Sequence, residues 1–254
     1  MNMERREDKM YNYKLVIQYD GSRYRGWQRL GNTGNTIQGK LENVLSEMTG
    51  EPIEVTGCSR TDAGVHALAQ VANFKTGKRY EESHIKEYLN RYLPKDISIL
   101  DVESVPERFH ARYNAKYKTY LYKIWNREYS NPFMRKYSMH VENKLDVDKM
   151  KEASQYFIGE HDFTAFSNAK SKKKSMVRMI YSVTVDQEDG FVLIRMVGNG
   201  FLYNMARKIA GTLIEVGLGK LDAGTIPDII NSRDRSRVSF IADACGLYLE
   251  KIAY

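Results

Sequence analysis

Cysteine is scarce in this chain, and long apolar runs are missing. Only Cys58 and Cys245 occur among the 254 residues, far apart and outside any paired spacing. This argues against a disulfide framework or a zinc site and predicts two reduced, buried thiols. No stretch approaches the roughly 18 consecutive apolar residues of a membrane span. The charged start of the chain has no apolar signal core, so we expect a cytoplasmic protein without membrane association.

Hydrophobic residues make up 42% of the sequence, which is enough for an ordinary globular core. The 39 basic and 32 acidic residues leave a net charge of +7. Such a balance suits a polyanionic partner such as nucleic acid but does not require one. Residues 1–10 are polar, and we expect them to form a disordered or frayed tail.

The first half of the chain alternates strand and helix patterns. In chain order we predict a strand over 14–19, a helix over 36–48, strands over 53–57 and 70–74, a helix over 84–92 and a strand over 97–102. This β-α-β-β-α-β order is that of a ferredoxin-like unit, in which both helices cover one face of an antiparallel sheet. We assign the unit to residues 11–106.

Residues 107–254 repeat the same order of elements. The pattern predicts a strand over 118–125, a helix over 146–157, a hairpin of 179–185 and 192–197 turning at Asp189-Gly190, a helix over 202–215 and a strand over 247–252. The expected fold class is therefore α+β, with two ferredoxin-like halves. Their antiparallel sheets are expected side by side, with a cleft between the halves.

Two stretches combine cations with a setting typical of RNA binding. In a glycine-flanked loop, Arg23, Arg25 and Trp27 stand among further aromatic and basic residues, a composition that stacks on bases and pairs with phosphates. The run 170–178 holds five cations without an acid, and phosphate contact and a solvated loop both fit it. Its centre is Lys172, Lys173 and Lys174.

The strand predicted over 118–125 is rich in tyrosine. Alternation along a strand puts Lys118, Tyr120 and Tyr122 on one face. That face is suited to contact RNA, and a half-buried sheet with tyrosine hydroxyls at the solvent explains the same pattern.

The segment 57–67, Gly-Cys-Ser-Arg-Thr-Asp-Ala-Gly-Val-His-Ala, places Arg60 two positions before Asp62. Small residues surround the carboxylate, so a substrate is able to approach it closely. An Asx-turn, in which Asp62 accepts the backbone N–H groups of its neighbours, explains the same residues without any chemistry. Composition alone therefore leaves a catalytic and a structural role open for Asp62.

The whole segment 57–67 resembles the catalytic segment of the bacterial tRNA pseudouridine synthase A family. The resemblance extends from about Tyr11 to the C-terminus. Further matches are Tyr19-Asp20-Gly21, Gly26-Trp27-Gln28, Thr36-Ile37-Gln38, Arg108-Phe109-His110-Ala111-Arg112, Tyr120, Tyr122, His161-Asp162-Phe163, Gly200-Phe201-Leu202 and Arg207. The stretch 29–35 departs from the family in length or composition, which bears on the range of substrates.

The resemblance implies isomerisation of uridine to pseudouridine on the 3′ side of the anticodon stem-loop of tRNA. It also implies a homodimer that needs neither a metal nor an organic cofactor. Asp62 matches the catalytic aspartate and Tyr120 the active-site tyrosine, whose ring is able to stack on the uracil. Arg207 matches the active-site basic residue, and Arg60 matches the residue that fills the space left by a flipped nucleotide.

The chemistry agrees with these residue types. Pseudouridine formation breaks a C–N glycosidic bond and rejoins the base through carbon, so no electron carrier is required. One ionised carboxylate is able to attack the base or sugar, or to stabilise a cationic sugar. A nearby guanidinium favours the ionised form of a carboxyl that the bound base shields from water. We therefore expect Asp62 and Arg207 to face each other across the cleft.

Two other functions fit parts of the sequence. An RNA chaperone or binder without catalysis also uses ferredoxin-like halves with exposed aromatics, but a carboxylate in its groove would repel phosphate. A metal-dependent hydrolase is suggested by His161-Asp162 and the five histidines. However, no histidine pair stands at helical i, i+4 spacing, and no acid cluster accompanies them.

Overall fold

The computed structural model describes residues 10–168 and 175–254. The expected tail, up to residue 9, and the predicted phosphate contacts Lys172, Lys173 and Lys174 lie outside these ranges. The contacts divide the chain into two compact units. Unit 1 holds the chain up to Ala63 together with Ala67–Ala115, and unit 2 holds Gly64–His66 and Lys116–Tyr254.

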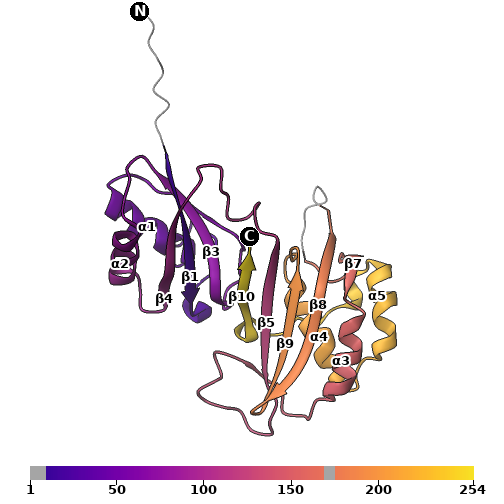
Figure 1. Ribbon diagram of the computed structural model, residues 1–254. Helices are drawn as coiled ribbons and strands as arrows, with labels where there is room; N and C mark the ends of the chain where they lie inside the picture. The colour runs from indigo at the N-terminus through magenta and orange to yellow at the C-terminus, as the bar shows by residue number, and fades with distance from the viewer. Residues whose placement is uncertain (1–9, 169–174) are drawn as a thin grey trace, which may run out of the picture. The chain divides into compact units, whose positions relative to one another are not determined.

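Unit 1 has the element order β-α-β-β-α-β. Its elements are β1 (Tyr11–Tyr19), α1 (Ile37–Thr49), β2 (Val55–Gly57), β3 (His66–Thr76), α2 (Glu82–Tyr92) and β4 (Ile97–Val105) (Figure 1). The first residue of β3, His66, is counted with unit 2. The strands pair in the order β4-β1-β3-β2, each antiparallel to its neighbour. The two helices contact each other, α1 also contacts β2, and α2 contacts β4. The predicted elements of this half are confirmed, and β1, β3 and β4 are longer than expected.

Helix α1 begins and ends where its sequence predicts. The Thr36 side chain accepts a hydrogen bond from the backbone N–H of Gly39, which caps the first turn. At the other end Gly50 adopts φ +73°, the left-handed conformation that glycine takes without steric cost. Between these ends Ile37, Leu41 and Leu45 are fully buried, so one apolar face holds the helix in the core.

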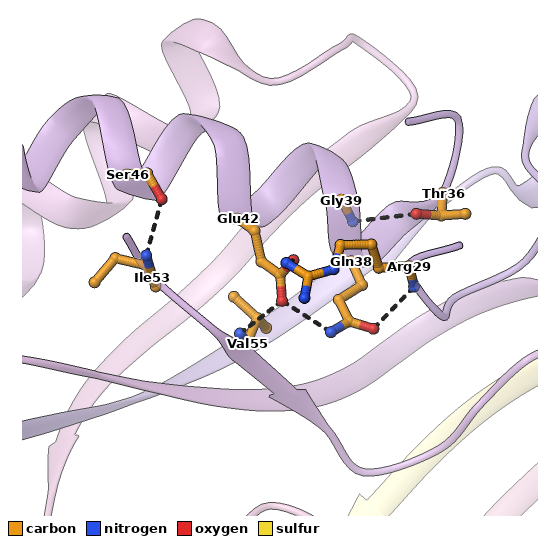
Figure 2. Close-up of polar contacts among 8 residues, drawn as sticks. All are labelled: Arg29, Thr36, Gln38, Gly39, Glu42, Ser46, Ile53 and Val55. Atoms are coloured by element: carbon orange, nitrogen blue, oxygen red, sulfur yellow. Dashed lines mark hydrogen bonds and ion pairs between the residues drawn. The ribbon is translucent and has the colours of Figure 1, made fainter. Parts of the chain in front are cut away.

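Glu42 lies on the buried face of α1 although it carries a charge. Its exposed fraction is 3%. The backbone N–H of Val55 and the side-chain amide of Gln38 donate to Oε1 over 3.0 and 2.8 Å, and the Arg29 guanidinium lies 2.9 Å from Oε2. Figure 2 shows these contacts, which tie α1 to β2 and to the loop before the helix.

Unit 2 contains a second β-α-β-β-α-β series. Its elements are β5 (Tyr117–Trp125), α3 (Val147–Gln155), β8 (Val177–Glu188), β9 (Phe191–Gly198), α4 (Met205–Gly217) and β10 (Leu247–Ala253) (Figure 1). The strands pair in the order β10-β5-β9-β8. When the four strands of each series are numbered along the chain, they lie in the sheet in the order fourth, first, third, second in both units. The predicted α+β class is confirmed.

Two short strands and one short α-helix of unit 2 were not predicted: β6 (Met139–His140), β7 (Gly159–Asp162) and α5 (Ile226–Ser232). Each is too short for a hydrophobic period to reveal it. The predicted β8–β9 hairpin is confirmed. Asp189 and Gly190 have φ values of 49° and 85°, and two positive φ angles in succession are typical of the tight turns that match strand twist.

Both cysteines are free. Cys58 is 1% exposed, as predicted, whereas Cys245 is only half-buried, which corrects the prediction that both thiols are buried. In the described ranges no helix is long and apolar enough to cross a membrane.

Candidate active site

Asp62 lies in the loop between β2 and β3. The Asp62 side chain is half-buried, while Thr61 before it is buried and Arg60 is exposed. Gly64, two residues further, adopts φ +81°, which a residue with a side chain rarely does. The carboxylate therefore stands at the edge of the core and is partly open to solvent.

The backbone before Asp62 is held by the loop that precedes α1. The backbone N–H of Trp27 donates to the Thr61 carbonyl over 3.0 Å, and the Tyr19 and Thr61 hydroxyl oxygens lie 2.7 Å apart. A Cβ on Gly26 would lie only 2.7 Å from the Thr61 carbonyl oxygen, so glycine is required for this close approach. These contacts position Asp62 before any substrate binds.

Two further side chains hold the segment 57–59. Gln70 is fully buried, accepts from the Ser59 N–H over 3.2 Å and donates to the Ser59 carbonyl over 2.8 Å. The Arg112 guanidinium donates to the carbonyls of Cys58 and Gly57 over 3.3 and 3.4 Å. Sequence reasoning assigned no role to Gln70 or Arg112, because the pairing of distant residues leaves no local signal.

Trp27 is 2% exposed, so the structure corrects its predicted role in stacking on RNA bases. A Cβ on Gly57 would lie 2.4 Å from the Trp27 ring, and the Tyr19 ring is 6.2 Å away. The tryptophan is a packing residue beneath the Asp62 loop.

Arg23 and Arg25, the predicted cations of the same loop, are both exposed. Arg23 forms an ion pair of 2.9 Å with Asp96, which also accepts a hydrogen bond from the Tyr24 hydroxyl. Burial and the Asp96 carboxylate raise the pKa of Tyr24 well above its usual range. No ion pair is found for Arg25 in the described part of the chain. Arg25 is therefore the more available of the two cations for a phosphate.

Tyr120 and Tyr122 of β5 both face the interior of unit 2. Tyr120 is 8% exposed, and its ring meets the Phe201 ring edge-on at 4.8 Å. Tyr122 is fully buried, and its hydroxyl donates a hydrogen bond to the Asp243 carbonyl over 2.8 Å. Its pKa is raised well above the usual value, mainly because the hydroxyl is buried. Tyr122 is therefore a core residue and does not present its ring at the surface.

Arg207 lies in the first turn of α4 and is half-buried. A cation near the N-terminus of a helix is repelled by the helix dipole, so its position needs other contacts. The Arg207 Nε donates to the Ala242 carbonyl over 2.7 Å, and the Ala242 N–H donates to the Arg207 carbonyl over 3.2 Å. The guanidinium is therefore held in place rather than freely solvated. Because Asp62 belongs to unit 1 and Arg207 and Tyr120 to unit 2, their predicted meeting stays a prediction.

The sequence matches the family of tRNA pseudouridine synthases over residues 15–114 and 153–254. The chain belongs to this family. Its relatives include a tRNA pseudouridine synthase A 2 from Bacillus cereus, which is 65% identical over 245 residues that cover 96% of this chain and 100% of that protein. A tRNA pseudouridine synthase A from a Bacillus species is 64% identical to this chain, and one from Acetivibrio thermocellus is 46% identical. Both alignments cover 96% of this chain and 100% of the relative. The predicted family resemblance is confirmed.

The histidines of this pseudouridine synthase family member do not gather into a metal site in the ranges 10–168 and 175–254. No group of three or more His, Cys, Asp and Glu side chains stands there in a position to hold an ion. His66, beside the Asp62 loop in sequence, is 2% exposed, stacks on Tyr248 at 4.8 Å and bonds to the Lys136 carbonyl over 2.9 Å. His66 is a core residue of unit 2.

Lys208, the neighbour of Arg207, is a buried cation that the sequence did not single out. It is 2% exposed, and its Nζ donates to the Ala165 carbonyl over 3.2 Å. No carboxylate pairs with it in the described part of the chain. Burial lowers the pKa of Lys208, and the positive charge of Arg235 lowers it further. The ammonium group is therefore expected to cost the fold stability.

We expect Lys208→Met to increase the free energy of unfolding by about 1 kcal/mol at neutral pH, because the variant no longer buries a charge. The folded-state pKa lies below the unfolded one, so the unfolded wild type binds more protons between the two values and wild-type stability rises with pH there. Urea unfolding from neutral to alkaline pH measures both effects. The control Lys144→Met, at an exposed lysine, should change neither; a destabilised Lys208→Met protein would show that the ammonium contributes favourably.

Proposed function

We propose that this chain isomerises uridine to pseudouridine on the 3′ side of the anticodon stem-loop of tRNA, with Asp62 as the catalytic carboxylate. The observation that carries the proposal is the setting of Asp62. Its side chain is partly open, while the backbone of residues 57–61 is held by Trp27, Gln70 and Arg112. A reacting group on a backbone fixed in advance loses little freedom at the transition state.

The reaction conserves atoms and electrons. The glycosidic C–N bond breaks, the uracil turns, a C–C bond forms to the same sugar carbon, and the proton of that base carbon moves to solvent or to nitrogen. Asp62, as the anion, attacks the base or the sugar or stabilises the cationic sugar. No oxidant or reductant takes part, and we propose that no metal or organic cofactor is used.

Three further residues have roles in this proposal. Arg207 supplies the positive charge that keeps Asp62 ionised when the base shields it from water. Tyr120 stacks on the uracil, and its hydroxyl assists removal of the proton from carbon. Arg60, exposed beside Asp62, enters the space that the flipped nucleotide leaves.

The direct test is to incubate unmodified tRNA with the purified protein and to map pseudouridine chemically at each nucleotide. We expect modification on the 3′ side of the anticodon stem-loop without added metal or cofactor. Pseudouridine only at other positions would overturn the site assignment. Bound tRNA without any pseudouridine would favour an RNA binder.

We also propose that the active protein is a homodimer, as the family resemblance implies. Sedimentation of the purified protein, with and without tRNA, measures this. A mass of one chain under both conditions would contradict it.

A further inference from the structure

The loop 127–137, between β5 and β6 of unit 2, exposes two large rings to solvent. Tyr129 is 76% exposed and Phe133 is 81% exposed. Single exposed apolar side chains are common and need no explanation. Here, however, both rings belong to one short loop whose backbone is ordered by many hydrogen bonds.

Hydrogen bonds hold the 127–137 loop at several points. The Trp125 indole N–H donates to the Tyr129 carbonyl over 2.8 Å, and the His140 ring bonds to the Arg127 carbonyl over 2.8 Å. The Asn131 side chain accepts from the Phe133 N–H over 3.0 Å. The rings are therefore presented from a preset backbone, and a partner that binds them orders little additional chain.

The charges beside the rings favour a polyanion. Arg127, Arg135 and Lys136 are exposed and form no ion pair in the described ranges, and Glu128 is the acid that accompanies them. Rings that stack on bases, next to cations that pair with phosphates, are the combination by which proteins bind unpaired nucleotides. Both kinds of side chain are exposed in this one loop.

A second exposed run of rings, on α2 of unit 1, lacks this charge bias. Its rings lie next to one another at tilted angles along the helix, from His84 to Tyr88 and then Tyr92. The same segment carries three acids and two cations, Glu81, Glu82, Glu87, Lys86 and Arg91. Its charges give no reason to expect phosphate.

We propose that the 127–137 loop binds unpaired nucleotides of the tRNA substrate. Tyr129 and Phe133 stack on bases, while Arg127 and Lys136 contact phosphates. The identity of the RNA rests on the proposed function, but the binding chemistry rests on the loop itself. Because the loop supplies no group to the reaction, it acts on the affinity for tRNA and leaves the rate at saturation unchanged.

The double variant Tyr129→Ala/Phe133→Ala tests the stacking. We expect its Kd for tRNA to rise at least about tenfold, since each base stacked on a ring contributes strongly to binding. KM should rise with Kd, and kcat should stay within about twofold of the wild type. The control Tyr156→Ala removes a ring at the end of α3 that is 36% exposed, and it should leave Kd within about twofold.

The variant Arg127→Gln/Lys136→Gln tests the phosphate contacts without changing the rings. The slope of log Kd against log salt should decrease by about 1 to 2, because two released counterions account for that much. Because both side chains are exposed, we expect this variant to fold. It therefore still tests the proposal if the double aromatic variant fails to fold.

The outcomes separate the alternatives. An unchanged Kd in the aromatic variant together with an unchanged salt slope in the cation variant overturns the proposal. A wild-type dimer that becomes a monomer in the aromatic variant also overturns it, since the loop would then contact a second copy of the chain. Weaker tRNA binding by the loop variants, in a protein that forms no pseudouridine, would support the loop proposal and refute the proposed function.

Discussion

Asp62→Asn is expected to abolish pseudouridine formation, by roughly a thousandfold or more, because the amide keeps the shape of the side chain but cannot act as an anionic nucleophile. The binding of tRNA should remain within about tenfold, because the basic surface that contacts phosphates is unchanged. Single-turnover assays with excess protein measure the first effect, and filter binding measures the second. Together they separate chemistry from binding.

The matched control is Asp101→Asn, which makes the same change at an exposed carboxylate of β4. It should keep turnover within about twofold of the wild type. Turnover of Asp62→Asn near the wild-type rate would refute the catalytic role. Equal losses in turnover and in tRNA binding would instead show that Asp62 stabilises the structure of its loop.

Glu42→Ala is expected to reduce the free energy of unfolding by about 3 kcal/mol. The substitution leaves the buried N–H of Val55 without its acceptor, removes the partner of Gln38 and opens a cavity under α1. Arg29 matters less, because its side chain is 61% exposed and water is able to solvate it. Urea unfolding followed by circular dichroism measures the change.

Two controls sharpen this prediction. Glu47→Ala, at an exposed position of the same helix, should change stability by less than about 0.5 kcal/mol. Arg29→Ala should cost less than about 1 kcal/mol, since the ion pair is half-solvated. A loss of under about 1 kcal/mol in Glu42→Ala would mean that the surrounding groups find other partners.

The order of elements was predictable because it depends on local signals. The cap at Thr36 and the left-handed Gly50 delimit α1, and the Asp189-Gly190 turn delimits the β8–β9 hairpin. Elements with too few residues to show a period, such as β6 and β7, were not predictable. The candidate catalytic residue was found through the long motif around Asp62, not through its composition.

The sequence by itself determined the family, the α+β class and the position of Asp62 in a loop between strands, because motifs and hydrophobic periods are written in neighbouring residues. Only the tertiary structure decided that Trp27 packs under that loop, that Glu42 joins α1 to β2 and that Gln70 clamps Ser59. Burial and hydrogen-bond partners depend on residues far apart along the chain, and such pairs leave no local pattern.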